Sequence, residues 1–194
     1  MSATGRSDVR RVDDHYETPE WAVRSLLEAV KLQEPIFDPG AGKGAITAAL
    51  LLAGYGNVYG LELDAERARL GRDRNLPVYH GDFLVHAKPG SHPRSIIANP
   101  PYSLAQEFID KALEVVDPFG RVFMLLRMNF LASKTRHEWW RTVGLTSVNV
   151  LSRRPSFTNG GSDACDYAWL EFWPERRRDP PPQDLNVRMR WLGW

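Results

Sequence analysis

The sequence predicts an α/β fold in which a doubly wound, mostly parallel sheet of about seven strands ends in an antiparallel last strand. Apolar runs rich in β-forming residues alternate with helical patterns along the chain, as they do in βαβ units. A glycine-rich turn joins the first of these strands to a helix. The last two strands follow each other without a helix between them, so we expect them to pair antiparallel at the sheet edge.

The individual elements follow from local signals. Thr18 is a candidate N-cap and Pro19 a candidate first helical residue, because proline lacks the N–H that a first helical turn leaves unsatisfied. After this first helix we expect further helices at 45–53, 65–72, 104–116 and 134–143. The expected strands are 35–37, 57–63, 77–79, 95–98, 121–126, 147–151 and 166–173.

The length and composition indicate one domain with two appendages. The chain has 194 residues, of which 43% are hydrophobic and 25% charged, which suits one soluble globular domain. The tail carries three arginines and then Pro180, Pro181 and Pro182, which cannot continue a helix or lie in a central strand. We expect a flexible arm over 1–15, a domain over 16–174 and an extended Arg/Pro-rich arm over 175–194.

Charge and cysteine content exclude several classes of protein. The 25 Lys and Arg residues nearly balance the 24 Asp and Glu residues, so any surface that binds nucleic acid is local. The single cysteine, Cys165, excludes an intrachain disulfide, and we expect no metal site. The chain has no apolar stretch long enough for a membrane span and no secretory signal, so we expect a cytoplasmic protein without membrane contact.

A glycine-rich segment at 38–44 is the first candidate binding site. It joins a strand to a helix N-terminus, where free backbone N–H groups face a ligand. A phosphate-binding P-loop is excluded, because positions 37 and 44 hold Phe and Gly. A dinucleotide fingerprint is partly met by Gly40, Gly42 and Ala45, with Glu62 downstream. Asp38 would repel a pyrophosphate and attract an ammonium group; a turn without a ligand stays an alternative.

The tetrapeptide Asn99-Pro100-Pro101-Tyr102 is the second candidate site. Each proline fixes its own φ and restricts the residue before it, so the chain leaves the strand as a stiff loop. The Asn99 side-chain oxygen and the Pro100 carbonyl can accept hydrogen bonds from one NH2 group, and the Tyr102 ring can stack on a planar base. Held in this way, an exocyclic amine presents its lone pair to an electrophile. The alternative is an ordinary proline turn after a strand.

Together these motifs resemble the S-adenosylmethionine-dependent amino-methyltransferases, specifically the N6-adenine and N4-cytosine DNA methyltransferases that carry Asn-Pro-Pro-Tyr. Tyr16-Glu17-Thr18-Pro19, the segment at 38–44, Gly60-Leu61-Glu62-Leu63-Asp64 and Gly81-Asp82-Phe83 match the family's motifs in order and spacing. The resemblance implies a Rossmann-like class I methyltransferase fold with S-adenosylmethionine as cofactor. It also implies methyl transfer to an exocyclic amine of a nucleobase, adenine N6 in DNA first.

The resemblance also implies roles for individual residues. Thr18 would approach the methionine carboxylate of the cofactor, Glu62 the ribose hydroxyls and Asp82 the adenine amino group. The implied cofactor contacts are Tyr16, Thr18, Asp38, Gly40, Ala41, Gly42, Glu62, Asp82 and Phe83. The implied catalytic residues are Asn99, Pro100, Pro101 and Tyr102.

Substrate contacts are expected on the loops that leave the fifth and sixth strands, because ligands of doubly wound sheets bind beyond the carboxyl ends of the strands. Arg127 in one loop and Arg153 and Arg154 in the other form a local basic rim suited to phosphates. Family members often have a second aromatic residue on the far face of the base, and Phe157 is our candidate for it.

The chain departs from the restriction-type enzymes of this family, because it has no room for a separate target-recognition domain. We therefore expect weak base-sequence reading or a protein partner that supplies it, and the oligomeric state stays open. Two alternative substrates are an RNA base and the glutamine amide of a protein, since a primary amide presents a similar NH2 group. A non-enzymatic alternative is a cofactor-binding accessory subunit.

Overall fold

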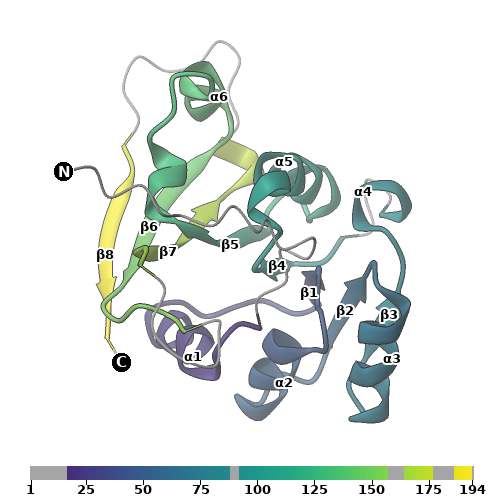
Figure 1. Ribbon diagram of the computed structural model, residues 1–194. Helices are drawn as coiled ribbons and strands as arrows, with labels where there is room; N and C mark the ends of the chain where they lie inside the picture. The colour runs from purple at the N-terminus through teal and green to yellow at the C-terminus, as the bar shows by residue number, and fades with distance from the viewer. Residues whose placement is uncertain (1–16, 88–91, 157–163, 177–185, 194) are drawn as a thin grey trace, which may run out of the picture.

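The computed structural model describes residues 17–87, 92–156, 164–176 and 186–193, which form one eight-stranded sheet with helices on both faces (Figure 1). The strands are β1 (Ile36–Pro39), β2 (Val58–Glu62), β3 (Val78–His80), β4 (Ser95–Ala98), β5 (Arg121–Arg127), β6 (Leu145–Leu151), β7 (Tyr167–Phe172) and β8 (Arg188–Leu192). The α-helices are α1 (Glu20–Ala29), α2 (Ala45–Leu52), α3 (Ala65–Asp73), α4 (Phe83–His86), α5 (Ala105–Val115) and α6 (His137–Thr142). Short 3-10 turns lie at Tyr102–Leu104, Met128–Leu131 and Pro174–Arg176.

The sheet has the strand order β3-β2-β1-β4-β5-β7-β6-β8. Every neighbouring pair is parallel except those made by β7, which runs antiparallel to both β5 and β6. The predicted doubly wound α/β sheet with one antiparallel strand is therefore confirmed. The order reverses between β1 and β4, which is the switch point where ligands of such sheets bind.

Helices cover the two faces of the sheet in two layers, α1, α2 and α3 on one side and α4, α5 and α6 on the other (Figure 1). Five consecutive residues of β5, from Val122 to Leu126, are buried, as expected of a central strand covered on both faces. In α5, Ala105, Phe108 and Ile109 recur at helical spacing and pack into the core. No described helix is long and apolar enough to cross a membrane.

The first helix begins one residue later than the sequence predicts. Its N-cap is Pro19, whose ψ of 140° is extended, so Thr18 lies outside the helix and is not its cap. Thr18 is instead buried. A hydrogen bond further along the helix attaches α1 to the sheet. The indole N–H of Trp169 in β7 donates a 2.8 Å hydrogen bond to the carbonyl of Ala22.

The prediction of an extended arm over 175–194 is wrong for its last segment, because Arg188–Leu192 form the strand β8. β8 runs parallel to β6, with Arg188 beside Ser147 and Leu192 beside Leu151. A proline restricts only its own backbone and the residue before it, so the five residues of β8 can still pair with a strand. Leu192 packs into the core beneath α1 with 3% of its surface exposed. The antiparallel pair β6–β7 is confirmed, but it lies inside the sheet and not at its edge.

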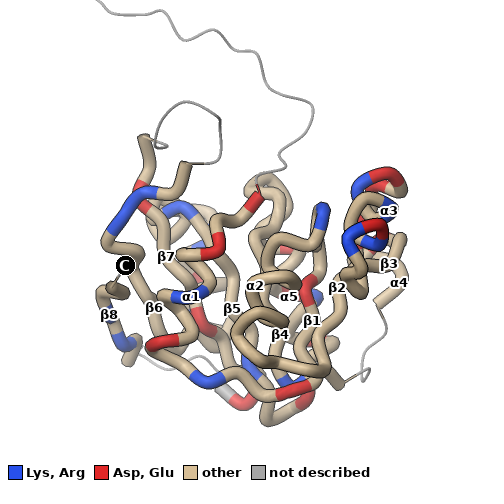
Figure 2. Tube along the Cα trace, turned by 90° about the horizontal axis from the view of Figure 1, so that it is seen from below, with Lys and Arg blue, Asp and Glu red and all other residues tan. Residues whose placement is uncertain are grey.

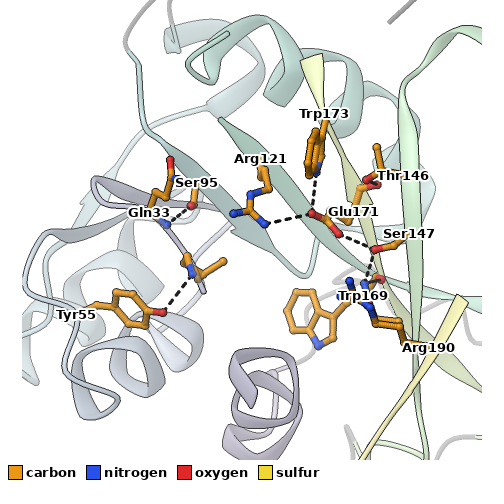
Figure 3. A network of polar contacts seen from close by, with 12 residues as sticks. Gln33, Tyr55, Ser95, Arg121, Thr146, Ser147, Trp169, Glu171, Trp173 and Arg190 are labelled. Carbon is orange, nitrogen blue, oxygen red and sulfur yellow. Dashed lines mark hydrogen bonds and ion pairs between the residues drawn. The ribbon is translucent and has the colours of Figure 1, made fainter. Parts of the chain in front are cut away.

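A buried carboxylate joins three strands at the sheet edge that contains the amino end of β5 (Figure 3). Glu171 in β7 accepts hydrogen bonds from the Ser147 hydroxyl at 2.6 Å and the Trp173 indole at 2.7 Å. The Arg121 guanidinium lies 3.6 Å from the same carboxylate. Because a buried charge needs partners, this network holds β5, β6 and β7 together at the edge opposite the carboxyl ends of the parallel strands.

Candidate active site

Three sequence motifs meet at the carboxyl ends of the parallel strands. Asp38 lies near the end of β1, Glu62 ends β2, and Asn99 directly follows β4, so the parallel pairing places them at one edge of the sheet. A cavity at this edge, here called the glycine-loop cavity, lies against the first and third of these residues. It is lined by Glu17, Thr18, Asp38, Gly40, Ala41, Ala45, Ile46 and Asn99. Residues as far apart in the sequence as Glu17 and Asn99 thus line one cavity.

The glycine loop is a tight turn that requires glycine. Gly40, Gly42 and Gly44 have φ values of 99°, 56° and 85°, in the left-handed region that other residues rarely adopt. The N–H of Gly40 donates a 2.7 Å hydrogen bond to the carbonyl of Leu61 in β2. A Cβ atom on Gly44 would lie 2.6 Å from Leu76 Cδ1, so the loop is closely packed from behind. Of these three glycines, Gly40 lines the cavity, so its backbone has no side chain of its own there.

Glu62 connects this loop to the end of β2. Its side chain is 4% exposed, and Oε2 accepts a 2.7 Å hydrogen bond from the N–H of Gly42. The other oxygen, Oε1, accepts from the N–H of Asp64 at 2.9 Å and from Nε of Arg67 at 3.2 Å. Since each carboxylate oxygen can accept two hydrogen bonds, Oε2 keeps acceptor capacity for a ligand.

Asp38 is the most unusual group of the site. It is fully buried, and neither carboxylate oxygen has a hydrogen-bond partner among the described residues. Burial, and next the charge of Glu62, raise the pKa of Asp38 well above its ordinary value of 3.8, while the Thr47 hydroxyl acts in the opposite direction. A cationic group in the cavity would stabilise the ionised carboxylate, so the site favours an ammonium ligand over a phosphate.

Asp82 and Phe83 follow β3 and begin α4. Asp82 is the N-cap, and its Oδ1 accepts a 2.9 Å hydrogen bond from the N–H of Leu84. Phe83 is 3% exposed, with its ring centroid 5.8 Å from that of Phe37 and 5.2 Å from that of Phe108. The described structure therefore places Asp82 at a strand end, as the sequence predicts, and Phe83 in the aromatic core behind it.

Phe108 is a site neighbour that the sequence does not reveal. A Cβ atom on Gly40 would lie 3.5 Å from its ring, so this side chain of α5 packs directly beneath the glycine loop. Phe108 lies on the apolar face of α5, as any core residue of a helix does. The sequence therefore does not distinguish a neighbour of the site from an ordinary core residue.

The Asn-Pro-Pro-Tyr loop lies between two cavities. Asn99 lines the glycine-loop cavity, and Tyr102 lines a second cavity of about 350 Å³, here called the tyrosine cavity. The other residues that line it are Ser103, Leu126, Arg127, Asn129, Phe130 and Arg136. Pro100 is buried, and Pro101 has φ −53° and ψ 123°, so the loop is held in an extended conformation between the cavities.

The arginines predicted as one basic rim occupy different surroundings. Arg127 is half-buried in the wall of the tyrosine cavity, with its guanidinium carbon 4.7 Å from the centroid of the Tyr102 ring. Arg153 and Arg154 are exposed and line neither cavity; Arg154 forms a 2.7 Å ion pair with Asp166. The structure therefore brings only Arg127 to the predicted catalytic loop. Tyr16 and Phe157 lie outside the described residues.

The segment after β5 supplies further residues of the tyrosine cavity, Asn129, Phe130 and Arg136. The Arg136 guanidinium lies 4.1 Å above the ring of Phe130 and donates a 2.8 Å hydrogen bond to its carbonyl. Trp139 packs edge-on against Phe130 and donates to Asp110 in α5 at 2.9 Å. This aromatic packing fixes one wall of the tyrosine cavity.

Comparison of sequences finds similar proteins that act on ribosomal RNA. No protein-family model matches the chain. Over 198 residues it is 25% identical to the ribosomal RNA small subunit methyltransferase A of Synechococcus sp. (strain CC9605), covering 94% of this chain and 68% of that protein. The same enzyme of Synechococcus sp. (strain JA-3-3Ab) is 28% identical over 156 residues, covering 73% and 55%.

Comparison of structures gives the same fold among methyltransferases. A dimethyladenosine transferase from Plasmodium falciparum matches with a TM-score of 0.62 and 17% identity, covering 86% of this chain and 64% of that one. The M protein of the type I restriction enzyme EcoKI matches with 0.59 and 17%, covering 92% and 47%. A TehB-like SAM-dependent methyltransferase from Corynebacterium glutamicum matches with 0.52 and 19%, covering 78% and 86%. The fold is that of class I S-adenosylmethionine-dependent methyltransferases.

Proposed function

We propose that this protein is an S-adenosylmethionine-dependent methyltransferase that acts on an exocyclic amine of a nucleobase, with adenine N6 as the acceptor. One observation carries the proposal: Asn99-Pro100-Pro101-Tyr102 stands between a cavity with a buried carboxylate and a second cavity lined by an aromatic ring. This arrangement suits a cofactor on one side and a planar acceptor on the other. The ribosomal RNA methyltransferases similar in sequence support the same reaction class.

Residues that line the glycine-loop cavity, together with Glu62 at the end of β2, suit groups of the cofactor. Asp38 is buried and has no hydrogen-bond partner among the described residues, so it suits the ammonium group of the methionine part; Gly40 lines the same cavity without a side chain. Oε2 of Glu62 has acceptor capacity for ribose hydroxyls. When bound, S-adenosylmethionine supplies an electrophilic methyl group on a sulfonium sulfur. Further contacts proposed for it are Tyr16, Thr18, Gly40, Ala41, Gly42, Asp82 and Phe83.

The catalytic loop would hold the acceptor. The side-chain oxygen of Asn99 and the carbonyl of Pro100 accept the two N–H groups of an exocyclic amine, which directs the nitrogen lone pair toward the glycine-loop cavity. Pro100 and Pro101 keep these acceptors in place before binding, so little ordering is needed in the reaction. Tyr102 stacks on the base, and no strong general base is required.

We infer that RNA is the first candidate for the nucleic acid, because the similar ribosomal RNA methyltransferases align over 94% of this chain. DNA is the second candidate, favoured by the Asn-Pro-Pro-Tyr motif of the DNA methyltransferases that the sequence resembles. If the acceptor lies in a duplex, the base has to leave the stack, and Tyr102 would replace part of the lost stacking.

We also infer that target recognition involves residues outside the two cavities. The candidates within the chain are Arg153, Arg154 and Phe157, and the alternative is a protein partner. We propose that the methyltransferase domain begins at residue 16 and includes β8. The exposed arginines suit backbone phosphates, which position a substrate without reading its sequence.

Transfer of a labelled methyl group tests the function. Purified protein is incubated with methyl-labelled S-adenosylmethionine and with total RNA, genomic DNA or release-factor protein, each from cells that lack the corresponding modification. We expect label in nucleic acid, more in RNA than in DNA, and at least about 100-fold less with Asn99→Ala. Label in protein glutamine would overturn the nucleobase assignment, and cofactor binding without any transfer would favour an accessory subunit.

A further inference from the structure

We propose that Arg127 is a positioning residue for Tyr102 and not a contact to backbone phosphate. Its guanidinium, held by the Tyr167 hydroxyl, stacks on the Tyr102 ring and sets the orientation in which that ring receives the acceptor base. This inference rests on the proposed function, because it assigns a supporting residue to the acceptor side of the same site.

The contacts of Arg127 point toward the catalytic loop. The guanidinium carbon lies 4.7 Å from the centroid of the Tyr102 ring, within the range of a cation–π contact. Its Nε donates a 2.9 Å hydrogen bond to the hydroxyl of Tyr167. The Tyr167 ring is 5.9 Å from the Tyr102 ring at an angle of 48°, so the three side chains form one cluster.

The support for this cluster is rigid. Arg127 ends β5 and is directly paired with Tyr167, the first residue of β7. Tyr167 is fully buried, and Tyr102 follows β4, which pairs with β5 on its other side. Arg127 and Tyr167 therefore stand on adjacent strands, where groups are positioned more accurately than on loops. Tyr102 begins the short 3-10 turn that follows the two prolines after β4.

The chemistry of the guanidinium suits this role. A planar guanidinium can stack on an aromatic ring and donate in its own plane at the same time, whereas a lysine ammonium is a point charge without a plane. Arg127 and Tyr102 also line the same cavity, so the stack forms part of the wall that an incoming base would meet. Loss of the stack should therefore lower kcat more than it weakens binding of the polynucleotide.

The two roles of Arg127 predict different kinetics. A phosphate contact contributes about one unit to the slope of log affinity against log salt, and its removal weakens substrate binding with little effect on kcat. A positioning residue affects kcat and leaves that slope unchanged. The test uses the full chain with an adenine-containing RNA substrate at a series of salt concentrations. The variants are Arg127→Lys, which keeps the charge without the planar group, Arg127→Gln, which removes the charge, Tyr167→Phe, and the double variant of Arg127→Lys with Tyr167→Phe.

We expect Arg127→Lys and Arg127→Gln each to lower kcat about tenfold or more, with unchanged calorimetric binding of S-adenosylmethionine. The salt slope should stay unchanged even in Arg127→Gln, which removes the charge. Tyr167→Phe should lower kcat by a smaller factor, and the double variant should be no worse than Arg127→Lys, because both changes break one unit. Arg69→Ala, on the exposed side of α3 where acidic and basic residues alternate (Figure 2), is the matched arginine control and should equal the wild type. An unchanged kcat with a shallower salt slope in Arg127→Gln would make Arg127 a phosphate contact and overturn the proposal.

A measurement that needs no activity separates this inference from the proposed function. The Nε–H resonance of Arg127, assigned by its absence in Arg127→Lys, is followed by 1H–15N NMR. It should shift in both Tyr102→Leu, which removes the ring current, and Tyr167→Phe, which removes the acceptor. A resonance that stays in place in both variants would refute the cluster even in an active enzyme. If the resonance shifts in both variants but the wild type never methylates nucleic acid, only the proposed function is contradicted.

Discussion

The backbone N–H of Gly42 donates a 2.7 Å hydrogen bond to Oε2 of Glu62, twenty residues further along the chain. This bond joins the glycine loop after β1 to the end of β2. It therefore fixes the loop against the residue proposed to bind the ribose. The same carboxylate thus has two tasks, to hold the loop and to receive a ligand, and its other oxygen is already bonded to Asp64 and Arg67.

Glu62→Ala should weaken binding of S-adenosylmethionine about 10- to 100-fold, because hydrogen bonds to a charged group are worth about 1.5–3 kcal/mol. Glu62→Gln should have a smaller effect, since its carbonyl oxygen can still accept from Gly42. Isothermal calorimetry measures both. Glu66→Ala, an exposed acid on α3, is the control and should bind like the wild type. Equal affinities for Glu62→Ala and the control would exclude Glu62 from the cofactor site.

Asp38 should make cofactor binding depend on pH. Because burial raises its pKa above the ordinary value of 3.8, the carboxyl group is protonated over part of the acidic range, and the ammonium group of a ligand favours its ionised form. Affinity should therefore rise as pH increases through the raised pKa and then level off. In Asp38→Asn, binding should be weaker and this rise absent. A wild-type profile that runs parallel to that of Asp38→Asn would contradict the assignment.

The stability of the protein without ligand should show the opposite dependence. A folded-state pKa above the unfolded one means that the folded state binds the proton more tightly, so the contribution of Asp38 is fully present below pH 3.8. It is lost as pH rises through the raised pKa. The difference in stability between Asp38→Asn and the wild type should therefore grow with pH in favour of the variant. Urea unfolding at several pH values measures this difference, and a constant difference would mean that the pKa of Asp38 is the same in the folded and unfolded protein, which would contradict a raised pKa.

Asn99→Ala should reduce methyl transfer about 100-fold or more, the usual cost of one lost hydrogen-bonding group aimed at the reacting atoms. Binding of S-adenosylmethionine should persist, because the buried carboxylate and the glycine loop remain. Single-turnover kinetics with calorimetry on the same sample separates the two effects. Retained transfer in Asn99→Ala would show that the amine is held by other groups.

Leu192→Ala tests whether the C-terminal strand contributes to the core. Leu192 is 3% exposed and packs beneath α1, so we expect a loss of about 2–3 kcal/mol in the free energy of unfolding. Its neighbour Trp191 is 69% exposed, and Trp191→Ala should change that free energy by about 0.5 kcal/mol or less. If the two variants unfold at the same urea concentration, β8 does not stabilise the sheet.

Most of the sheet could be predicted because its signals are local. The apolar runs of β4 and β5, the glycine turn after β1 and the alternation of helices and strands each lie within a few residues. β8 could not be predicted in this way, because its pairing with β6 is a contact between distant segments and the neighbouring prolines dominate the local pattern. Thr18 was misassigned for a related reason, since Pro19 keeps extended geometry at the start of α1.

The polar residues of the site were predictable where chemistry restricts the residue type. Asp38 and Glu62 lie at the carboxyl ends of β1 and β2, and Asn99 directly follows β4, so parallel pairing of these strands brings the three residues to one edge. The surroundings of Arg127 and Phe83 depend on packing between elements, which the sequence does not encode at short range. Arg127 turned out to lie against Tyr102 in the cavity wall, and Phe83 in the aromatic core with Phe108.

The chemical identity of the methylated unit tests the central claim most directly. Nucleic acid treated with the protein and labelled S-adenosylmethionine is digested to nucleosides, and the labelled product is identified by mass spectrometry, with Asn99→Ala in parallel. The account predicts methylation at the N6 amine of adenosine or deoxyadenosine in the wild type, at least about 100-fold above the variant. Label on a ring nitrogen, a ribose hydroxyl or an amino acid would contradict it.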